Sequence, residues 1–259
     1  MLPVIDAHIH IDAYNEEEQS LILNQLQLYK IDSLIVVSNH LASAQNVLTL
    51  ADANSRIKPA IGYHPEQILP TEQELDDLLQ LINQHHHQLI GIGEVGLPHY
   101  LRRGHPNISI NPYINVLETF IQTAKTYDLP IILHAVYEDA LLTCDLLEKH
   151  NVKKAHFHWF KGDEQIIKRM IDNQYYISIT PDILYKERTK KLVKEYPLSL
   201  IMVETDGPWP FEGPFNNELT HPKMVHQSIS EIALLKQMDI DSVYIQLYRN
   251  TVEFYSLNI

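Results

Sequence analysis

The sequence predicts an α/β fold, a single-domain (β/α)8 barrel of the TIM type, from three observations. Eight short apolar runs rich in β-branched or aromatic residues alternate with longer amphipathic segments. One run and its amphipathic segment together take roughly 30 residues, the usual size of a strand–helix unit. No GxGxxG turn, which is typical of a doubly wound open sheet, follows the first run. Composition does not shift anywhere within residues 1–259, so we expect one domain.

The elements follow in order along the chain. Continuous apolar runs are typical of strands buried on both faces, as in a parallel sheet. We expect such strands at 3–8, 33–38, 58–63, 89–94, 130–135, 155–160, 175–180 and 200–205. Helical spacing occupies most of the segments between the strands, for example 16–30, 71–84, 111–128, 137–150 and 163–173, and two closing helices are expected in 220–257. Thr71 and Glu74 have the spacing of a capping box, and Asp163 begins an acidic first turn. The longest irregular stretches, 99–109 and 207–222, follow predicted strands, where a barrel carries its active-site loops.

Charge and composition limit the possible partners. Lys and Arg number 20 and Asp and Glu 33, a net charge of −13 that argues against extended, sequence-blind binding of nucleic acid. The net charge does not exclude a small pocket that binds one phosphate or the end of a nucleic-acid strand. No apolar run is long enough to cross a membrane, and we expect no signal peptide. The chain has one cysteine, Cys144, so it has no internal disulfide, and we expect a cytoplasmic protein. Cys144 itself is expected to be buried in a helix. The oligomeric state stays open.

Polar side chains stand at the ends of five predicted strands. The carboxyl ends of barrel strands meet at one mouth, so these residues are expected to be neighbours. Four imidazoles and two carboxylates there favour a divalent metal site with nitrogen and oxygen ligands. Six ligands with a central carboxylate suit two ions that this carboxylate bridges. The residues are His8, His10, Glu94, His134, His158 and Asp206.

Each residue also has a purely structural interpretation. A single buried histidine can be held by hydrogen bonds, Glu94 can pair with a neighbouring cation, and Asp206 before Gly-Pro can make a turn. His64 can bind a substrate oxygen or cap a turn. The run 85–87 is all histidine, but it precedes a predicted strand and is expected to face solvent.

These residues lie in motifs that resemble the TatD family of metal-dependent hydrolases, within the amidohydrolase-like barrels. The motifs are DAHIH at 6–10, IGYHPE at 61–66, GEVGL at 93–97, HA at 134–135, FHWFKGD at 157–163, ETDGP at 204–208 and NTVEFY at 250–255. The resemblance implies two divalent ions (Zn, Mn, Mg or Ni). One would be held by His8, His10, Glu94 and Asp206, and the other by Glu94, His134 and His158. It selects His158 over His156, and it makes Asp206 the carboxylate that handles the proton.

Two positions depart from the family pattern. Pro98 stands where the family usually has Asp, and Val136 where it usually has Arg. An Arg fork pairs well with phosphate oxygens. The neighbouring loops carry four candidate substitutes, which are His99, Arg102, Arg103 and Lys161.

The favoured function is two-metal hydrolysis of a phosphodiester at the end of a DNA strand. In it Glu94 and Asp206 are catalytic, and His64 and Trp209 bind substrate. Trp159, Trp209 and Phe211 are expected either to line the mouth and stack on a base or to pack in the core. One alternative is an amidohydrolase or esterase acting on a small-molecule carbonyl, which Val136 and the net charge favour slightly. The other is a non-catalytic metal-binding barrel, which the presence of all six candidate ligands disfavours.

Overall fold

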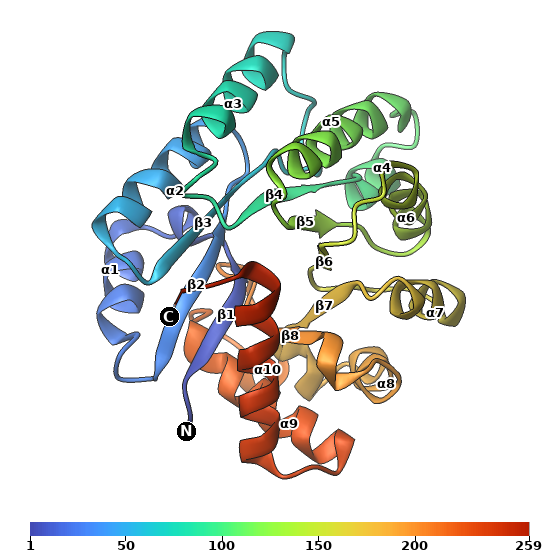
Figure 1. The fold of residues 1–259 in the computed structure, drawn as a ribbon. Coiled ribbons are helices and arrows are strands. Elements are labelled where there is room, and N and C mark those ends of the chain that lie inside the picture. The colour runs from blue at the N-terminus through green and yellow to red at the C-terminus, as the bar shows by residue number, and fades with distance from the viewer. Residues whose placement is uncertain (259) are drawn as a thin grey trace.

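The strands form one sheet that curls into a nearly closed barrel (Figure 1). The computed structural model describes residues 1–258, and each strand pairs in parallel with the next along the chain. All eight predicted strands are confirmed. They are β1 Val4–Ile9, β2 Ile31–Val37, β3 Ile57–Ile61, β4 Gly91–Gly96, β5 Ile131–His134, β6 Ala155–Phe157, β7 Tyr176–Ile179 and β8 Ile201–Val203.

The first and last strands meet through contacts beyond the end of β8. The backbone N–H of Asp206 donates to the carbonyl of His8 at 2.9 Å, and that of His10 donates to Gly207 at 2.8 Å. The buried carboxylate of Asp6 accepts from the backbone N–H and the hydroxyl of Thr205, at 2.9 and 2.5 Å. These bonds fix the two strand ends that carry the candidate ligands beside each other.

Helices surround the barrel, as the alternating pattern predicts (Figure 1). Short 3-10 helices lie in the loops at Ile11–Ala13, Pro181–Leu184, Leu198–Leu200, Gly213–Phe215 and Pro222–Met224. The α-helices are α1 Glu16–Gln25, α2 Leu41–Ala53, α3 Glu72–His85, α4 His99–Gly104, α5 Asn111–Tyr127, α6 Glu138–His150, α7 Glu164–Asp172, α8 Glu187–Glu195, α9 Val225–Lys236 and α10 Ile240–Tyr255.

The helix predictions are largely confirmed, with two corrections. The side chains of Thr71 and Asp163 cap α3 and α7, as their spacing predicts. The first predicted helix was too long, since α1 ends at Gln25. The stretch 99–109 is not wholly irregular, because it begins with α4. Glu66, from the loop after β3, accepts the backbone N–H groups that open this short helix, a contact between distant segments that local pattern does not show.

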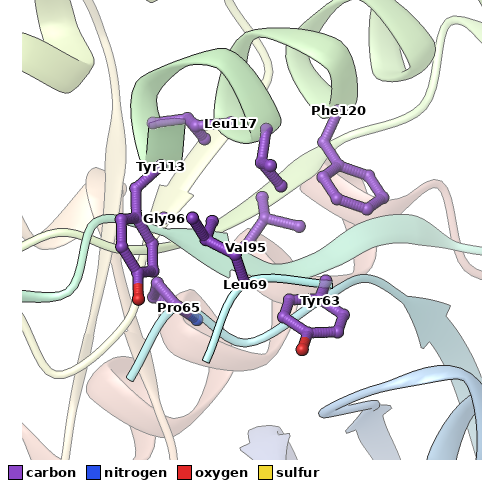
Figure 2. A pocket seen from close by; sticks show the side chains of 9 residues that line it. Tyr63, Pro65, Leu69, Val95, Gly96, Tyr113, Leu117 and Phe120 are labelled. Carbon is purple, nitrogen blue, oxygen red and sulfur yellow. The ribbon is translucent and has the colours of Figure 1, made fainter. Parts of the chain in front are cut away.

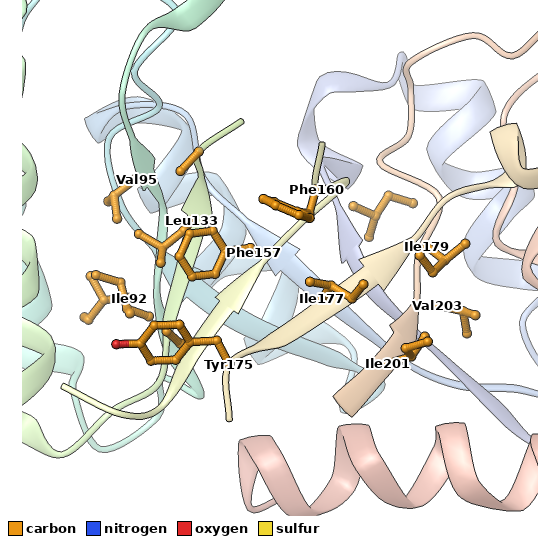
Figure 3. Close-up of a cluster of buried hydrophobic side chains, with 14 of the residues drawn as sticks. Ile92, Val95, Leu133, Phe157, Phe160, Tyr175, Ile177, Ile179, Ile201 and Val203 are labelled. Atoms are coloured by element: carbon orange, nitrogen blue, oxygen red, sulfur yellow. The ribbon is translucent and has the colours of Figure 1, made fainter. Parts of the chain in front are cut away.

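Apolar side chains fill two layers. The larger lies between strands and helices, where Figure 3 shows Ile92, Leu133 and Phe157 from adjacent strands. The smaller contains Ile5, Ala7, Ile35, Val37, Ala60, Ile132 and Met202 with the end of α10. Cys144 is buried in the larger layer, as predicted. The candidate ligand residues lie outside these layers, at the carboxyl ends of the strands.

A small space under α5 is a packing feature. Figure 2 shows Tyr113, Leu117 and Phe120 of this helix facing Val95 and Tyr63. Its volume of about 10 Å³ admits at most one water molecule. Among residues 1–258, no helix is long and apolar enough to cross a membrane.

Candidate functional site

The barrel brings the six predicted ligand residues together around Glu94. His8 and Glu94 lie within β1 and β4, and His134 is the last residue of β5. His10 and His158 directly follow β1 and β6, and Asp206 lies three residues beyond β8. All come from carboxyl ends of strands, so their convergence follows from the parallel topology.

One oxygen of Glu94 faces the histidines of the first strand. Glu94 Oε2 lies 3.2 Å from His8 Nε2 and 3.1 Å from His10 Nε2. The two nitrogens are 3.4 Å apart. Asp206 Oδ1 completes this group, at 3.5 Å from His8 Nε2 and 3.6 Å from His10 Nε2.

The other oxygen of Glu94 faces a second group. Glu94 Oε1 lies 2.7 Å from His158 Nε2 and 2.9 Å from His134 Nδ1, and these nitrogens are 3.2 Å apart. His64 Nε2 is 3.4 Å from the same oxygen. His64, predicted as a substrate-binding residue, therefore lies beside the candidate ligands themselves.

The donor atoms fit divalent ions. Nitrogen and oxygen ligands about 2.0–2.2 Å from a shared ion lie about 3–3.5 Å from each other, close to the separations found here. Glu94 Oε2 is buried without a hydrogen-bond partner, which an ion would supply. Three groups in residues 1–258 have the spacing to hold an ion, namely His8, His10 and Glu94; His64, Glu94 and His134; and His8, His158 and Glu204.

Burial and neighbouring charges shift the pKa values of the two carboxylates, Glu94 and Asp206, in opposite directions. Burial alone would raise the pKa of Glu94, but the charges of His158, His64 and His8 outweigh it and hold the pKa well below its usual value. Burial raises the pKa of Asp206 to about 7, against the opposing effect of His10. Glu94 is thus a firmly ionised centre, whereas Asp206 takes up a proton more easily.

Comparison with known proteins gives this geometry a family. The model of the TatD related DNase family matches residues 5–256. The chain belongs to this family. A metal-dependent hydrolase of Haemophilus influenzae, itself uncharacterized, is 39% identical over 255 residues, which cover 98% of this chain and 100% of the relative. Deoxyribonuclease TATDN3 of Homo sapiens is 27% identical over 261 residues, covering 97% of this chain and 94% of the human protein.

A solved structure confirms the architecture. The TatD homologue YjjV of Escherichia coli superimposes with a TM-score of 0.86 at 22% identity, covering 98% of each chain. The chain is therefore a metal-dependent hydrolase of the TatD family built on the predicted barrel.

Two glycines allow the strand ends of this TatD barrel to approach. A Cβ atom on Gly96 would overlap the carbonyl of His134, and one on Gly207 would overlap the hydroxyl of Tyr14. Gly96 therefore permits β4 and β5 to bring Glu94 and His134 together. Asp206 has a left-handed backbone with φ of 51°, held by the bond from its N–H to His8.

Glu66 is a residue that sequence reasoning did not single out. Its Oε1 lies 3.1 Å from His134 Nε2, on the side of the ring that faces away from Glu94. Burial alone would lower the pKa of His134, but hydrogen bonds to Glu66 and Glu94 together raise it to about 9. The IGYHPE motif contains Glu66, but its role depends on the approach of β5.

Glu204 is a second such residue. It is fully buried and accepts from Ser178 Oγ at 2.5 Å and from the backbone N–H of Trp159 at 2.7 Å. Burial and the nearby charge of Asp206 raise its pKa well above the usual value. Its Oε1 lies 3.8 Å from His158 Nδ1, which is too far for a hydrogen bond.

His156 differs from the histidines of the mouth. Its Nδ1 is 2.7 Å from the hydroxyl of Tyr255, and its Nε2 is 2.6 Å from Ser178 Oγ. Both ring nitrogens of this buried residue are therefore satisfied within the protein.

An open cavity of about 890 Å³ lies over the candidate ligands. His64 and Trp209, the predicted substrate-binding residues, both line it, and Trp209 is 59% exposed. Trp159 also lines this mouth cavity, whereas Phe211 packs in a buried cluster with Phe215 and Met224.

Of the four candidate substitutes for the family arginine, Lys161 lines the mouth cavity. His99, Arg102 and Arg103 line a neighbouring cavity of about 680 Å³ instead. Arg102 is also paired with Asp139, at 3.1 Å. Val136 is buried and apolar, and it supplies no donor where the family usually has Arg.

Proposed function

We propose that this TatD-family hydrolase cleaves phosphodiester bonds at the end of a DNA strand, using two divalent ions. One ion would be held by His8, His10, Glu94 and Asp206, and the other by Glu94, His134 and His158. The observation that carries the proposal is the position of Glu94, whose two oxygens face two separate histidine groups. A carboxylate placed in this way is suited to bridge two ions.

Divalent ions (Zn, Mn, Mg or Ni) bound there supply Lewis-acid polarisation of the substrate and lower the pKa of water. Asp206 takes the proton of the attacking water and later returns it to the leaving group. The bond from its backbone N–H to the carbonyl of His8 fixes its carboxylate beside the histidines, where it can reach the water. Glu94 stays ionised and holds the two histidine groups together.

The mouth cavity supports a nucleotide substrate. Trp209 and Trp159 present aromatic surface on which a base stacks, with ring centroids 6.2 Å apart. His64 lies within reach of a substrate oxygen near Glu94. The human relative is named a deoxyribonuclease, which favours the same substrate class.

One observation favours a second candidate, an amidohydrolase or esterase acting on a small carbonyl compound. The end of β5 carries the buried, apolar Val136 instead of a cation. An uncharged carbonyl substrate needs no such cation, and the same ions would polarise its oxygen.

The experiment compares substrates and variants. Purified protein is assayed with Mg²⁺, Mn²⁺ and Zn²⁺ on a single-stranded oligonucleotide and on a panel of amides and esters, while elemental analysis counts the ions. We expect nucleotide release and two ions per chain. Asp206→Asn should lower turnover on the order of 10²–10⁴-fold with the fold intact, whereas the exposed Asp172→Asn should not change it.

Nucleotide release by no metal form, with hydrolysis of an amide or ester, would favour the carbonyl hydrolase. Turnover of neither class would leave a metal-binding barrel without catalysis. Full activity of Asp206→Asn would contradict the assigned proton transfer.

A further inference from the structure

Lys161 and Arg188 are two of the cations that line the mouth cavity, which Glu94 and Asp206 also line. Lys161 lies in the loop after β6, and Arg188 lies in the first turn of α8. The chain carries a net charge of −13, so a pair of cations beside the candidate catalytic carboxylates runs against its overall composition. The candidate metal ligands do not account for either residue.

The contacts of Lys161 leave its charge available. Its Nζ donates to the hydroxyl of Tyr100 at 2.8 Å and lies 4.2 Å from the ring centroid of Trp159. Among the ion pairs found in residues 1–258, none includes Lys161. An ammonium group has three donors, so two remain for a ligand.

Arg188 is held in a similar way. Its Nη1 donates to the hydroxyl of Tyr137 at 3.0 Å, while Asp182 Oδ2 lies 3.9 Å from its Nη2. A guanidinium group has five N–H donors, so most stay free. A phenol hydroxyl therefore holds each cation in place, and Arg188 is also paired with Asp182 through one of its nitrogens.

Tyr137 connects the two. Its hydroxyl accepts from Arg188, and its backbone N–H donates to the carbonyl of Lys161 at 2.6 Å. Its φ of 52° with ψ of −132° is a strained conformation for a residue with a side chain. Strain of this kind is concentrated at ligand-binding sites, where the surrounding contacts hold it in place.

Two positive charges held close together at a partly covered surface repel each other. Burial and the charge of Arg188 both lower the pKa of Lys161, the expected result of such a pair. A bound anion removes this repulsion and gains charge-assisted hydrogen bonds from both groups.

We propose that Lys161 and Arg188 form an anion subsite that binds a phosphate group of the substrate next to the scissile bond. The proposal rests on the hydrolase function proposed above and names where its substrate is held. Lys161 Nζ lies 4.2 Å from the ring centroid of Trp159, so an anion bound by Lys161 lies beside that aromatic side chain of the mouth cavity. Phosphate of a DNA end and phosphate of a small ester share this chemistry.

Both cations also line an adjoining cavity of about 540 Å³ between α7 and α8. That cavity also carries Asp163, Glu164 and Glu195, and its Lys191 is paired with Glu164. The cations left for a ligand are therefore Lys161 and Arg188, which suits one phosphate group and not a long polyanion.

The test measures binding of inorganic phosphate to the metal-loaded protein by calorimetry at 0.15 M salt. Lys161→Gln and Arg188→Gln should each weaken binding about tenfold, and the double variant more. Arg188→Lys keeps the charge and should recover most of the affinity. The matched control is Lys191→Gln on α8, because Lys191 is already paired with Glu164 at 2.8 Å. The control should bind phosphate within about twofold of the unchanged protein.

Phosphate affinity that stays unchanged in the folded double variant would overturn the subsite, since phosphate would then bind at the ions alone. This holds even if the protein cleaves DNA. Conversely, a protein that cleaves no oligonucleotide but loses phosphate binding in the variants keeps the subsite and loses the proposed nuclease function. Competition by a 5′-phosphorylated dithymidylate and by ribose 5-phosphate separates the two sources, and either one binding through Lys161 and Arg188 supports the subsite.

Discussion

Buried histidines occur in two regions of this molecule with opposite surroundings. His226 on α9 has both ring nitrogens hydrogen-bonded, Nδ1 to the hydroxyl of Tyr244 at 2.8 Å and Nε2 to the carbonyl of Tyr29 at 2.7 Å. At the barrel mouth the Nδ1 atoms of His8 and His10 have no partner, and their Nε2 atoms converge on one carboxylate oxygen.

The difference distinguishes packing from chemistry. A buried polar group is costly unless it is satisfied, so the complete bonding of His226 is what a structural residue requires. The mouth instead gathers groups that repel one another when protonated, and their arrangement is stable only with ions or a fixed carboxylate between them. Substitutions should therefore affect function at the mouth and stability at α9.

The largest effect is expected at the centre of the mouth. Glu94→Gln keeps the shape of the side chain but removes the charge that both histidine groups face. We expect loss of bound metal and a fall in turnover on the order of 10³-fold, with the fold retained. Elemental analysis, a turnover assay and far-UV circular dichroism measure these outcomes. The exposed Glu72→Gln serves as control, and a metal-replete, active Glu94→Gln would remove Glu94 from the centre.

A smaller effect is expected at Glu66, which contacts the candidate ligand His134. Glu66→Ala removes the acceptor of His134 Nε2 and frees the ring to rotate away from Glu94. Affinity for the ion on that side should fall about 10–100-fold, the usual range for carboxylates that orient a ligand histidine. Glu66→Gln retains an acceptor oxygen and should lose less. Metal titration of dialysed protein measures both, and equal affinity of all three proteins would show that Glu66 serves α4 alone.

The strands and the gathering of the candidate ligands at one mouth were predictable because the signals are local. An apolar run with a histidine or carboxylate near its carboxyl end marks the strand and the residue that it brings to the mouth, as Glu94 and His134 show. α4 was not predictable, since its N-terminus is satisfied by Glu66, 34 positions earlier in the chain.

The supporting residues were harder to find for the same reason. Glu204 was quoted within the ETDGP motif, but its role depends on Ser178 and on the backbone of Trp159. Arg188 lies in the charged, amphipathic α8, where a cation usually means a solvated face. Its position at the mouth follows from how α8 packs, which residue spacing does not specify.

For His226 on α9, we expect a substitution to lower stability and to leave turnover unchanged. His226→Leu leaves the carbonyl of Tyr29 and the hydroxyl of Tyr244 without their partner. Unsatisfied buried groups cost about 1–3 kcal/mol, so the free energy of unfolding should fall by that amount. Turnover per folded molecule should not change. Urea unfolding and an activity assay test the pair of expectations, with the exposed His87→Leu as control. A His226→Leu variant that is stable but inactive would contradict the claim that His226 serves stability and the mouth histidines serve function.

The smallest expected effect is a pH dependence of the free energy of unfolding. It comes from His221, which lies directly before the 3-10 helix Pro222–Met224. Burial, and secondarily the charge of Lys223, lowers the pKa of His221 from 6.5 to about 4. Below pH 6.5 the unfolded chain then binds a proton that the folded chain excludes. The contribution of His221 is therefore fully present above that pH and is lost as the pH falls from 6.5 toward 4.

His221→Asn removes this titration while its Oδ1 can replace the ring nitrogen that accepts from the backbone N–H of Lys223. Between pH 7 and 5, the free energy of unfolding of the variant should fall less than that of the unchanged protein, by on the order of 1 kcal/mol. The mouth histidines contribute equally to both proteins, so the difference between the two pH profiles reports the titration of His221 alone. Parallel pH profiles would mean that His221 is protonated in the folded protein and that burial does not lower its pKa.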